Sequence, residues 1–252
     1  MSNDSRSVTV ITVVFNAKEL IERTLKSVAS QTYERVNHLI IDGGSTDGTL
    51  ELLSNWSSIT LVTGRDKGIY DAMNKGLQQA TGDYVIFINA GDELANEKVL
   101  ADMLGICDGR DVYYGDTLIV DAARNVLGLR RHSLPKRLTW KSFRMGMLVS
   151  HQSILARKSI CPEYNLEYKI SADIDWSIRL LKSAGEVCYY AKPVSLFLAG
   201  GESTRRKRLG LTERWRISVR HYGLLTTILS HAAIVARALY YLFTGSFRAV
   251  HT

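Results

Sequence analysis

The feature that most constrains the fold is an alternation of β-branched apolar runs with amphipathic stretches over the first hundred residues. The run VTVITVVF (8–15) is apolar almost throughout, as expected for a strand buried on both faces. The stretch AKELIERTLKSVASQ (17–31) follows with apolar residues at 20, 21, 25 and 28, the spacing of a helix with one buried face. Strand-like runs return at 36–42, 59–64 and 84–88. This alternation predicts right-handed βαβ crossovers and a mainly parallel sheet.

The remaining elements follow from similar patterns. Helices are predicted at DGTLELLSNW (47–56), with Ser45 or Thr46 placed to cap it, and at GIYDAMNKGLQQA (68–80). Between about 110 and 200 the pattern is mixed. It predicts a hairpin from 111–121 and 125–134, a helix over 171–185 that ends at Gly185, and two short strands at 186–191 and 194–201.

Polar residues stand where the predicted parallel strands end, which is where open α/β sheets bind ligands. They are Asn16, Asp42, Gly64 to Asp66, and Asp92. A nucleotide diphosphate would need an acid or amide for its base and ribose and a divalent cation for its phosphates. One aspartate suffices for Mg²⁺ or Mn²⁺ when phosphates and water supply the other ligands. Each acid taken alone is equally well explained as a turn cap.

Other nucleotide-binding classes lack their signatures. The turn after the first strand reads FNAKEL, so the G-x-G-x-x-G of dinucleotide-binding proteins is absent. A P-loop and the HExxH, CxxC and GxSxG motifs are absent as well. A nucleotidyltransferase would share the layered sheet, but it would need a Gly-rich turn containing arginine at FNAKEL.

Five segments carry a resemblance that spans about residues 8–200. VITVVFNA, LIIDGGSTDGTLELL, DKGIYDAMNKGLQQATGDYVIFINAGDEL, HQSILARKS and ISADIDWSIRLLKSAG together resemble family 2 glycosyltransferases of the GT-A fold. Bacterial enzymes of exopolysaccharide, colanic-acid or O-antigen synthesis are the most similar in pattern. The resemblance implies an α/β fold, in which a mostly parallel nucleotide-binding sheet carries helices on both faces. It also implies transfer of a sugar from a nucleotide-diphosphate sugar, with inversion and with a divalent cation (Mg²⁺ or Mn²⁺).

The resemblance also assigns roles to individual residues. Asp92 matches the second, metal-binding acid of a D-x-D-type motif whose first acid is lost here, with Asn89 nearby and Gly91 opening the approach. Asp173 matches the catalytic base. Asp175 is a competitor for that role, and the helix dipole alone would also explain an acid at this position. Substrate contacts are expected from Asn16, Asp42, Asp66, Asp71, Asn74, His151, Gln152 and Asp175. The lost acid leaves a catalytically inactive nucleotide-sugar-binding or scaffold protein as an alternative.

The net charge of +7 comes entirely from the last part of the chain. Residues 1–199 contain 23 basic and 23 acidic side chains, whereas residues 200–252 contain nine basic residues and only Glu202 and Glu213. An apolar stripe at helical spacing follows the basic stretch, with Tyr240 and Tyr241 as expected interface anchors. These features predict peripheral contact with an anionic membrane surface through 205–247, beside a polyprenyl-diphosphate-linked acceptor. Packing on the catalytic domain or on a second subunit is the alternative. No nucleic-acid-binding pattern accompanies the charges.

The run LTERW (211–215) lacks the glutamine of the Q-x-x-R-W motif that processive family members carry, which predicts a single addition per encounter.

We expect a catalytic domain over 1–200, with a donor half (1–110) and an acceptor half (111–200), and a helical extension over 201–252. The N-terminus has no signal-peptide pattern, which favours a cytoplasmic protein at the inner membrane face. The three cysteines, Cys107, Cys161 and Cys188, are expected to be unpaired buried hydrophobes.

Overall fold

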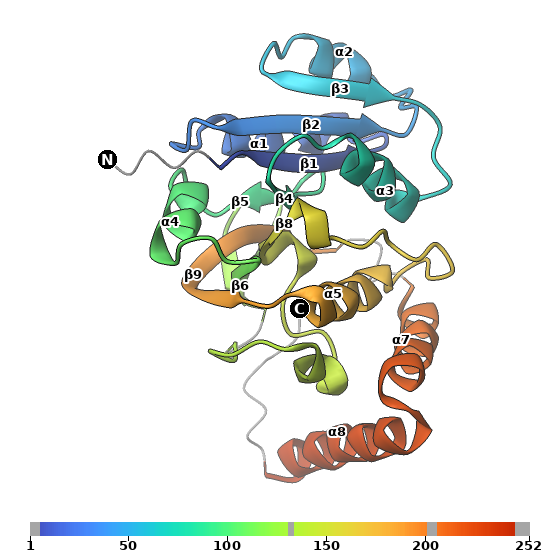
Figure 1. Cartoon of the computed structure of the whole chain (residues 1–252). Coiled ribbons are helices and arrows are strands. Elements are labelled where there is room, and N and C mark those ends of the chain that lie inside the picture. The colour runs from blue at the N-terminus through green and yellow to red at the C-terminus, as the bar shows by residue number, and fades with distance from the viewer. Residues whose placement is uncertain (1–5, 131–133, 201–205, 245–252) are drawn as a thin grey trace.

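The computed structural model describes residues 6–130, 134–200 and 206–244, and for 207 and 237–244 the backbone alone. Its N-terminal half alternates strands and helices in the order expected (Figure 1). The elements are β1 (Val8–Val14), α1 (Lys18–Ala29), β2 (Val36–Asp42), α2 (Thr49–Ser54), β3 (Ile59–Thr63), α3 (Ile69–Gln79), β4 (Tyr84–Phe87), β5 (Glu93–Leu94) and α4 (Val99–Ile106).

The second half contains longer strands and three short 3-10 helices. In order these are β6 (Val112–Val120), β7 (Val126–Leu129), η1 (Trp140–Met145), η2 (His151–Ser153), β8 (Ile154–Arg157), η3 (Lys158–Ile160), α5 (Ala172–Ser183), β9 (Val187–Leu198), α7 (Lys207–Tyr222) and α8 (Leu224–Thr244). Within the described ranges, no helix combines the length and the apolarity that crossing a lipid bilayer requires.

The strands form one sheet in the order β3-β2-β1-β4-β8-β6-β9-β5, with β7 paired to β6. The pairs among β3, β2, β1 and β4 are parallel, so their carboxyl ends meet at one edge. The second half is mixed, because β8 runs antiparallel to β4 and β6, whereas β6 and β9 are parallel. The sequence therefore predicted the parallel N-terminal half of the sheet and the β6–β7 hairpin, and the structure confirms an α/β fold of this type.

Helices cover both faces of the sheet. Alternate residues of β1 explain this, because Ile11 and Val13 pack with α3 and α5, whereas Val10 and Val14 pack with helices on the opposite face. Those opposite helices are α1, α2 and α4. The helices α7 and α8 lie beyond α5, at the end of the molecule opposite β2 and β3 (Figure 1).

Three local expectations are wrong. Gly48, not Ser45 or Thr46, is the N-cap of α2, and no side chain caps this helix. The Ser45 hydroxyl instead accepts a hydrogen bond from the Asn16 N–H. The two short strands predicted near 186–201 are one strand, β9, because shifts of register opposite Gly115 to Thr117 accommodate its Pro193.

The third correction concerns the cysteines. Cys107, at the end of α4, and Cys188, on β9, form a disulfide across 81 residues of sequence. Spacing along the chain could not reveal this pair, because the fold alone brings α4 against β9. Cys161 is free, as expected, and burial raises the pKa of its thiol to about 12.

Helix α3 sits close to the sheet because Gly76 faces it. A Cβ at this position would lie 2.5 Å from Ile11 Cγ2 and 3.2 Å from Ile41 Cγ1. We therefore expect Gly76→Ala to lower the free energy of unfolding by about 1–3 kcal/mol, although alanine favours helices. Gly105 in α4 is the matched control, since a Cβ there meets open space. Gly105→Ala should raise stability by about 0.5 kcal/mol. Urea unfolding of both variants tests this, and equal effects would contradict the packing argument.

Candidate active site

The turns after β1 and β2 are bonded to each other. Asn16, with a positive φ of 48°, accepts a hydrogen bond at Oδ1 from the Thr46 N–H (2.8 Å). The Asn16 N–H donates to Ser45 Oγ (2.8 Å). The two strand ends therefore form one continuous rim at the carboxyl edge of the sheet.

Asp42 is fully buried at the end of β2. Its Oδ2 accepts hydrogen bonds from the N–H groups of Gly44 (2.8 Å) and Ser45 (3.0 Å), whereas its Oδ1 has no partner. One oxygen thus shapes the Gly-Gly turn, as the turn-cap interpretation requires, and the other remains available to a ligand.

An acid and an aromatic ring lie beside this turn, and the sequence analysis did not predict that they would be neighbours. A Cβ on Gly43 would lie 3.1 Å from Asp66 Oδ2 and 3.3 Å from Phe15 Cδ2. Phe15 is 62% exposed, although it ends a core strand. An exposed ring next to a side-chain-free turn suits stacking with a planar base, and the only signal in the sequence was an aromatic residue at a strand end.

Asp66 and Asp71 share one basic partner, Lys75. The Lys75 ammonium forms an ion pair with Asp66 and lies 3.7 Å from Asp71 Oδ2. Asp71 also accepts a hydrogen bond from the Lys67 N–H (3.0 Å). These acids therefore order the loop before α3 as well as facing the rim.

Asn74 differs from the expectation that it lines the substrate cleft. It is buried, and its amide donates to the Tyr164 carbonyl (3.0 Å) and accepts from the Tyr164 N–H (2.6 Å). Both polar ends are used to fix Tyr164, so Asn74 acts on the site only through that residue.

Asp92 lies in the loop between β4 and β5 and is 6% exposed. Its Oδ1 accepts a hydrogen bond from the Leu198 N–H (2.7 Å), and its Oδ2 accepts one from the Gln152 amide. Gly91 before it has φ +94°, a conformation that side chains rarely adopt. Burial raises the pKa of Asp92 to about 7, although the hydrogen bonds from Leu198 and Gln152 and the charge of Arg130 act in the opposite direction.

Asp173 is the second residue of α5, with 18% of its side chain exposed. His151 Nδ1 lies 3.6 Å from Asp173 Oδ2, beyond hydrogen-bonding distance, and neither ring nitrogen of His151 has a hydrogen-bond partner. Burial acts to raise the pKa of Asp173, but His151 and Arg130 more than offset it and hold that pKa below its ordinary value. The carboxylate is therefore ionised at neutral pH.

The two acids are held by adjacent residues. His151 faces Asp173, and the next residue, Gln152, bonds to Asp92. Two adjacent residues of the short helix η2 thus contact Asp92 and face Asp173.

Asp175 is arranged differently from Asp173. It is 1% exposed, and its two oxygens bond to Arg179 Nε (2.7 Å) and to His221 Nε2 (2.7 Å). Both partners hold the pKa of Asp175 below its ordinary value against the effect of burial. This carboxylate joins α5 to α7 and is less available as a base than Asp173.

Arg130 is a site residue that sequence reasoning missed. Its guanidinium lies 5.3 Å from the centre of the Phe197 ring and interacts electrostatically with both Asp92 and Asp173. It follows β7, and no motif marks it. A cation between two acids can neutralise a bound diphosphate.

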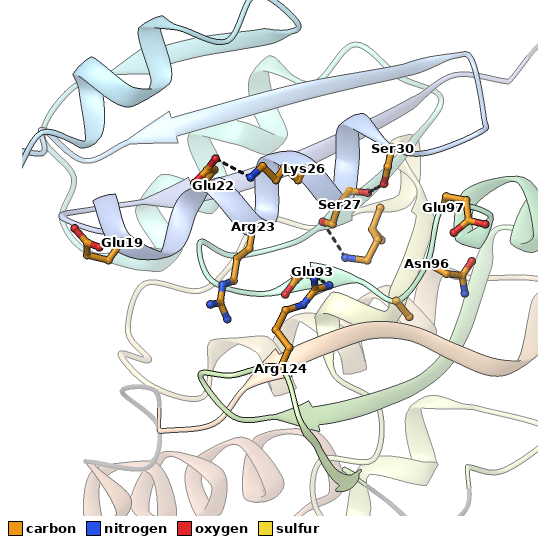
Figure 2. Close-up of a pocket in the computed structure, with 12 residues that line it drawn as sticks. Glu19, Glu22, Arg23, Lys26, Ser27, Ser30, Glu93, Asn96, Glu97 and Arg124 are labelled. Carbon is orange, nitrogen blue, oxygen red and sulfur yellow. Dashed lines mark hydrogen bonds and ion pairs between the residues drawn. The ribbon is translucent and has the colours of Figure 1, made fainter.

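A cavity of about 600 Å³ lies elsewhere, between α1, β5 and the β6–β7 turn (Figure 2). Glu93, next in sequence to Asp92, lines it with Arg23 and Arg124, and burial raises the pKa of Glu93. Glu93 lines this cavity, whereas Asp92, Asp173 and Asp42 do not.

The described residues include no cluster of three His, Cys, Asp or Glu side chains that would hold a metal ion unaided. What lies at the rim is the Asp92 carboxylate and Asn89 Oδ1, a buried oxygen with no hydrogen-bond partner. These are the hard oxygen donors that Mg²⁺ and Mn²⁺ prefer, and they suit an ion that takes its other ligands from a diphosphate.

Several known proteins are similar to this chain in sequence or in fold. A PGL/p-HBAD biosynthesis glycosyltransferase of Mycobacterium bovis is 29% identical over 192 residues, which is 72% of each chain. The crystal structure of S. aureus TarS 1-349 in complex with UDP-GlcNAc superimposes with a TM-score of 0.70 at 17% identity, over 93% of this chain and 73% of that one. The mannosyltransferase PcManGT from Pyrobaculum calidifontis, in complex with GDP-Man and Mn²⁺, gives 0.63 at 18% identity, over 99% and 82%. The profile of glycosyl transferase family 2 matches residues 9–161, and the chain therefore belongs to that family.

Proposed function

We propose that this glycosyltransferase moves one sugar from a nucleotide-diphosphate sugar to a saccharide acceptor, with inversion, in cell-surface polysaccharide synthesis. The observation that carries the proposal is that two adjacent residues contact the two acids. Gln152 bonds to Asp92, and His151 faces Asp173. Structural neighbours solved with UDP-GlcNAc or GDP-Man support a nucleotide-sugar donor. The free Oδ1 of Asp42, the exposed ring of Phe15 and Asn16 at the rim support base and ribose binding there.

Inversion follows from a single displacement. The acceptor hydroxyl oxygen bonds to the anomeric carbon as the bond from that carbon to the diphosphate oxygen breaks. Asp173 takes the hydroxyl proton, which its lowered pKa and its position beside His151 allow. The diphosphate leaves with the bonding electrons, and Arg130 stabilises its added charge. A divalent cation held by Asp92 and Asn89 would supply further positive charge to the diphosphate.

Replacement of the base tests the reaction. Asp173→Asn keeps the shape of the side chain but cannot take a proton, so kcat should fall by roughly 10²–10⁴ while donor affinity is retained. Asp175→Asn should lower the melting temperature and reduce kcat less than about tenfold, because that acid serves the α5–α7 contact. Transfer assays with panels of UDP- and GDP-sugars measure both. Equal background rates for wild type and Asp173→Asn would favour the inactive binding protein, and loss of activity only in Asp175→Asn would make Asp175 the base.

Metal dependence is expected to reside at Asp92. Donor binding should raise the melting temperature, and Mn²⁺ should increase that rise in the wild type. In Asp92→Asn the increase due to Mn²⁺ should be lost, because an amide binds the ion more weakly, while the shift without metal remains. Asp102→Asn, on α4, is the control, since this acid pairs with Lys192 away from the rim. Full Mn²⁺ enhancement in Asp92→Asn would exclude it as the metal-binding acid.

We further propose that α7 and α8 contact an anionic membrane at the cytoplasmic face, where a polyprenyl-diphosphate-linked acceptor would lie. The stripe residues Leu224, Leu225, Ile228 and Val235 are 47–72% exposed. Thr227, which is 1% exposed, and His231 share the face of α8 that contacts α7, and the His231 ring lies 4.8 Å from that of Trp215 on α7. Leu225 and Leu229 lie about 160° around the helix from Thr227, so these two exposed leucines face away from α7. Tyr240 and Tyr241 lie among the side chains that are not described.

Vesicle co-sedimentation tests this surface. Leu225→Ser with Leu229→Ser removes two exposed leucines, which are 72% and 62% exposed. Binding to phosphatidylglycerol vesicles should fall at least about tenfold. Leu127→Ser with Leu129→Ser on β7 is the control, at 48% and 41% exposure. Unchanged vesicle binding, together with dissociation of a dimer in sedimentation, would show that the stripe packs on a second subunit.

A further inference from the structure

The α7 helix places a buried carboxylate against the segment that precedes the catalytic helix. Glu213, within the LTERW run, is 2% exposed. Its Oε1 accepts a hydrogen bond from the Lys169 N–H (2.7 Å), and its Oε2 accepts bonds from the N–H groups of Ile170 (2.9 Å) and Ser171 (2.8 Å). Three consecutive backbone donors thus converge on one side chain from a distant part of the sequence.

The segment 169–171 has no regular secondary structure of its own. Ser171 is the N-cap residue of α5, but its side chain makes no capping hydrogen bond and instead points to the Gly210 carbonyl (3.4 Å). On the other side, the Tyr70 hydroxyl donates to the Ile170 carbonyl (2.9 Å). The start of α5 is therefore fixed by groups from α3 and α7, and Glu213 supplies the largest share of the bonds.

This anchoring sets the position of Asp173. Asp173 stands two residues after Ser171, and its carboxylate lies 3.6 Å from His151 Nδ1. A hydrogen bond to an ionised acceptor is about twice as strong as a neutral one, so three of them hold a short segment firmly. A shift of about 1 Å in a reacting group can cost about 10²-fold in rate.

We infer that Glu213 is a positioning residue for sugar transfer, and that α7 is part of the catalytic unit and not only an appended helix. The inference rests on the proposed role of Asp173 as the base. A second contact also joins α7 to the start of α5, because His221 of α7 bonds to Asp175, two residues after Asp173. The donor-binding rim, formed by β1, β2 and β4, makes no use of Glu213.

The test is kinetic and uses the full chain. In Glu213→Gln, one of the two oxygens becomes an amide that donates, so at least one backbone N–H loses its acceptor. We expect kcat to fall at least tenfold while the KM for the donor, and the thermal shift it causes, stay within about twofold of wild type. Glu167→Gln is the matched control. Glu167 lies in the segment before α5, but it is 61% exposed and pairs with Arg220 at the surface. It should leave both constants unchanged.

If Glu213→Gln does not fold, Tyr70→Phe tests the same anchoring of the segment before α5. It removes the hydroxyl that donates to the Ile170 carbonyl and that also contacts the backbone of Ala172 and Asp173 at the start of α5, and it should lower kcat several-fold at unchanged donor KM. The double variant should lose less than the product of the two single losses, because both groups act through one segment. Wild-type kcat in Glu213→Gln, or in Tyr70→Phe where the first variant does not fold, would overturn the inference. So would a rise in donor KM that accounts for the whole loss. Full activity in Asp173→Asn would instead overturn the proposed base, whatever Glu213 does.

Discussion

The site depends on the hydrogen bond between Gln152 and Asp92. Asp92 is almost fully buried, and an ionised carboxylate in that environment is costly unless it accepts hydrogen bonds. Gln152 and the Leu198 N–H provide them, and so tie the end of β4 to η2 and to β9. Because His151 is the neighbour of Gln152, the same contact fixes the ring that faces Asp173. One hydrogen bond therefore relates the donor half of the sheet to α5.

The surroundings of this contact shift the pKa values of Asp92 and Asp173 in opposite directions. Burial pushes the pKa of Asp92 up to about 7, whereas His151 and Arg130 hold that of Asp173 below its ordinary value. Two carboxylates in one site thus differ in proton affinity, which is the condition for giving them different roles. In the proposed reaction, Asp173 would accept a proton in its ionised form, and a bound cation would favour the ionised form of Asp92.

The parts of the site that the sequence revealed are those on regular elements. Asp42 and Asp92 follow buried parallel strands, so the strand pattern placed them on one edge, and Asp173 stands in the first turn of a helix that the sequence predicted, although the helix ends at Ser183, before the expected stop at Gly185. Arg130 and Glu213 had no such signal, because each acts across a tertiary contact between segments far apart in sequence. The same reason hid the Cys107–Cys188 disulfide, and it hid the contacts that turn Asn74 and Asp175 inward.

Buried polar atoms without partners indicate where a ligand belongs. Such atoms are rare in folded proteins, because each costs about 1–3 kcal/mol when desolvated. Among the described residues they include Asp42 Oδ1, Asn89 Oδ1 and both ring nitrogens of His151, all at the carboxyl edge of the sheet or beside Asp173. By contrast, the carboxylates of Asp175 and Glu213 have partners for both oxygens and serve to hold α7 on α5. The acids that hold α7 on α5 are thus fully hydrogen-bonded, whereas Asp42 Oδ1 and Asn89 Oδ1 have no partner. A sugar nucleotide that supplies hydroxyl donors at these atoms would therefore bind and stabilise the same edge.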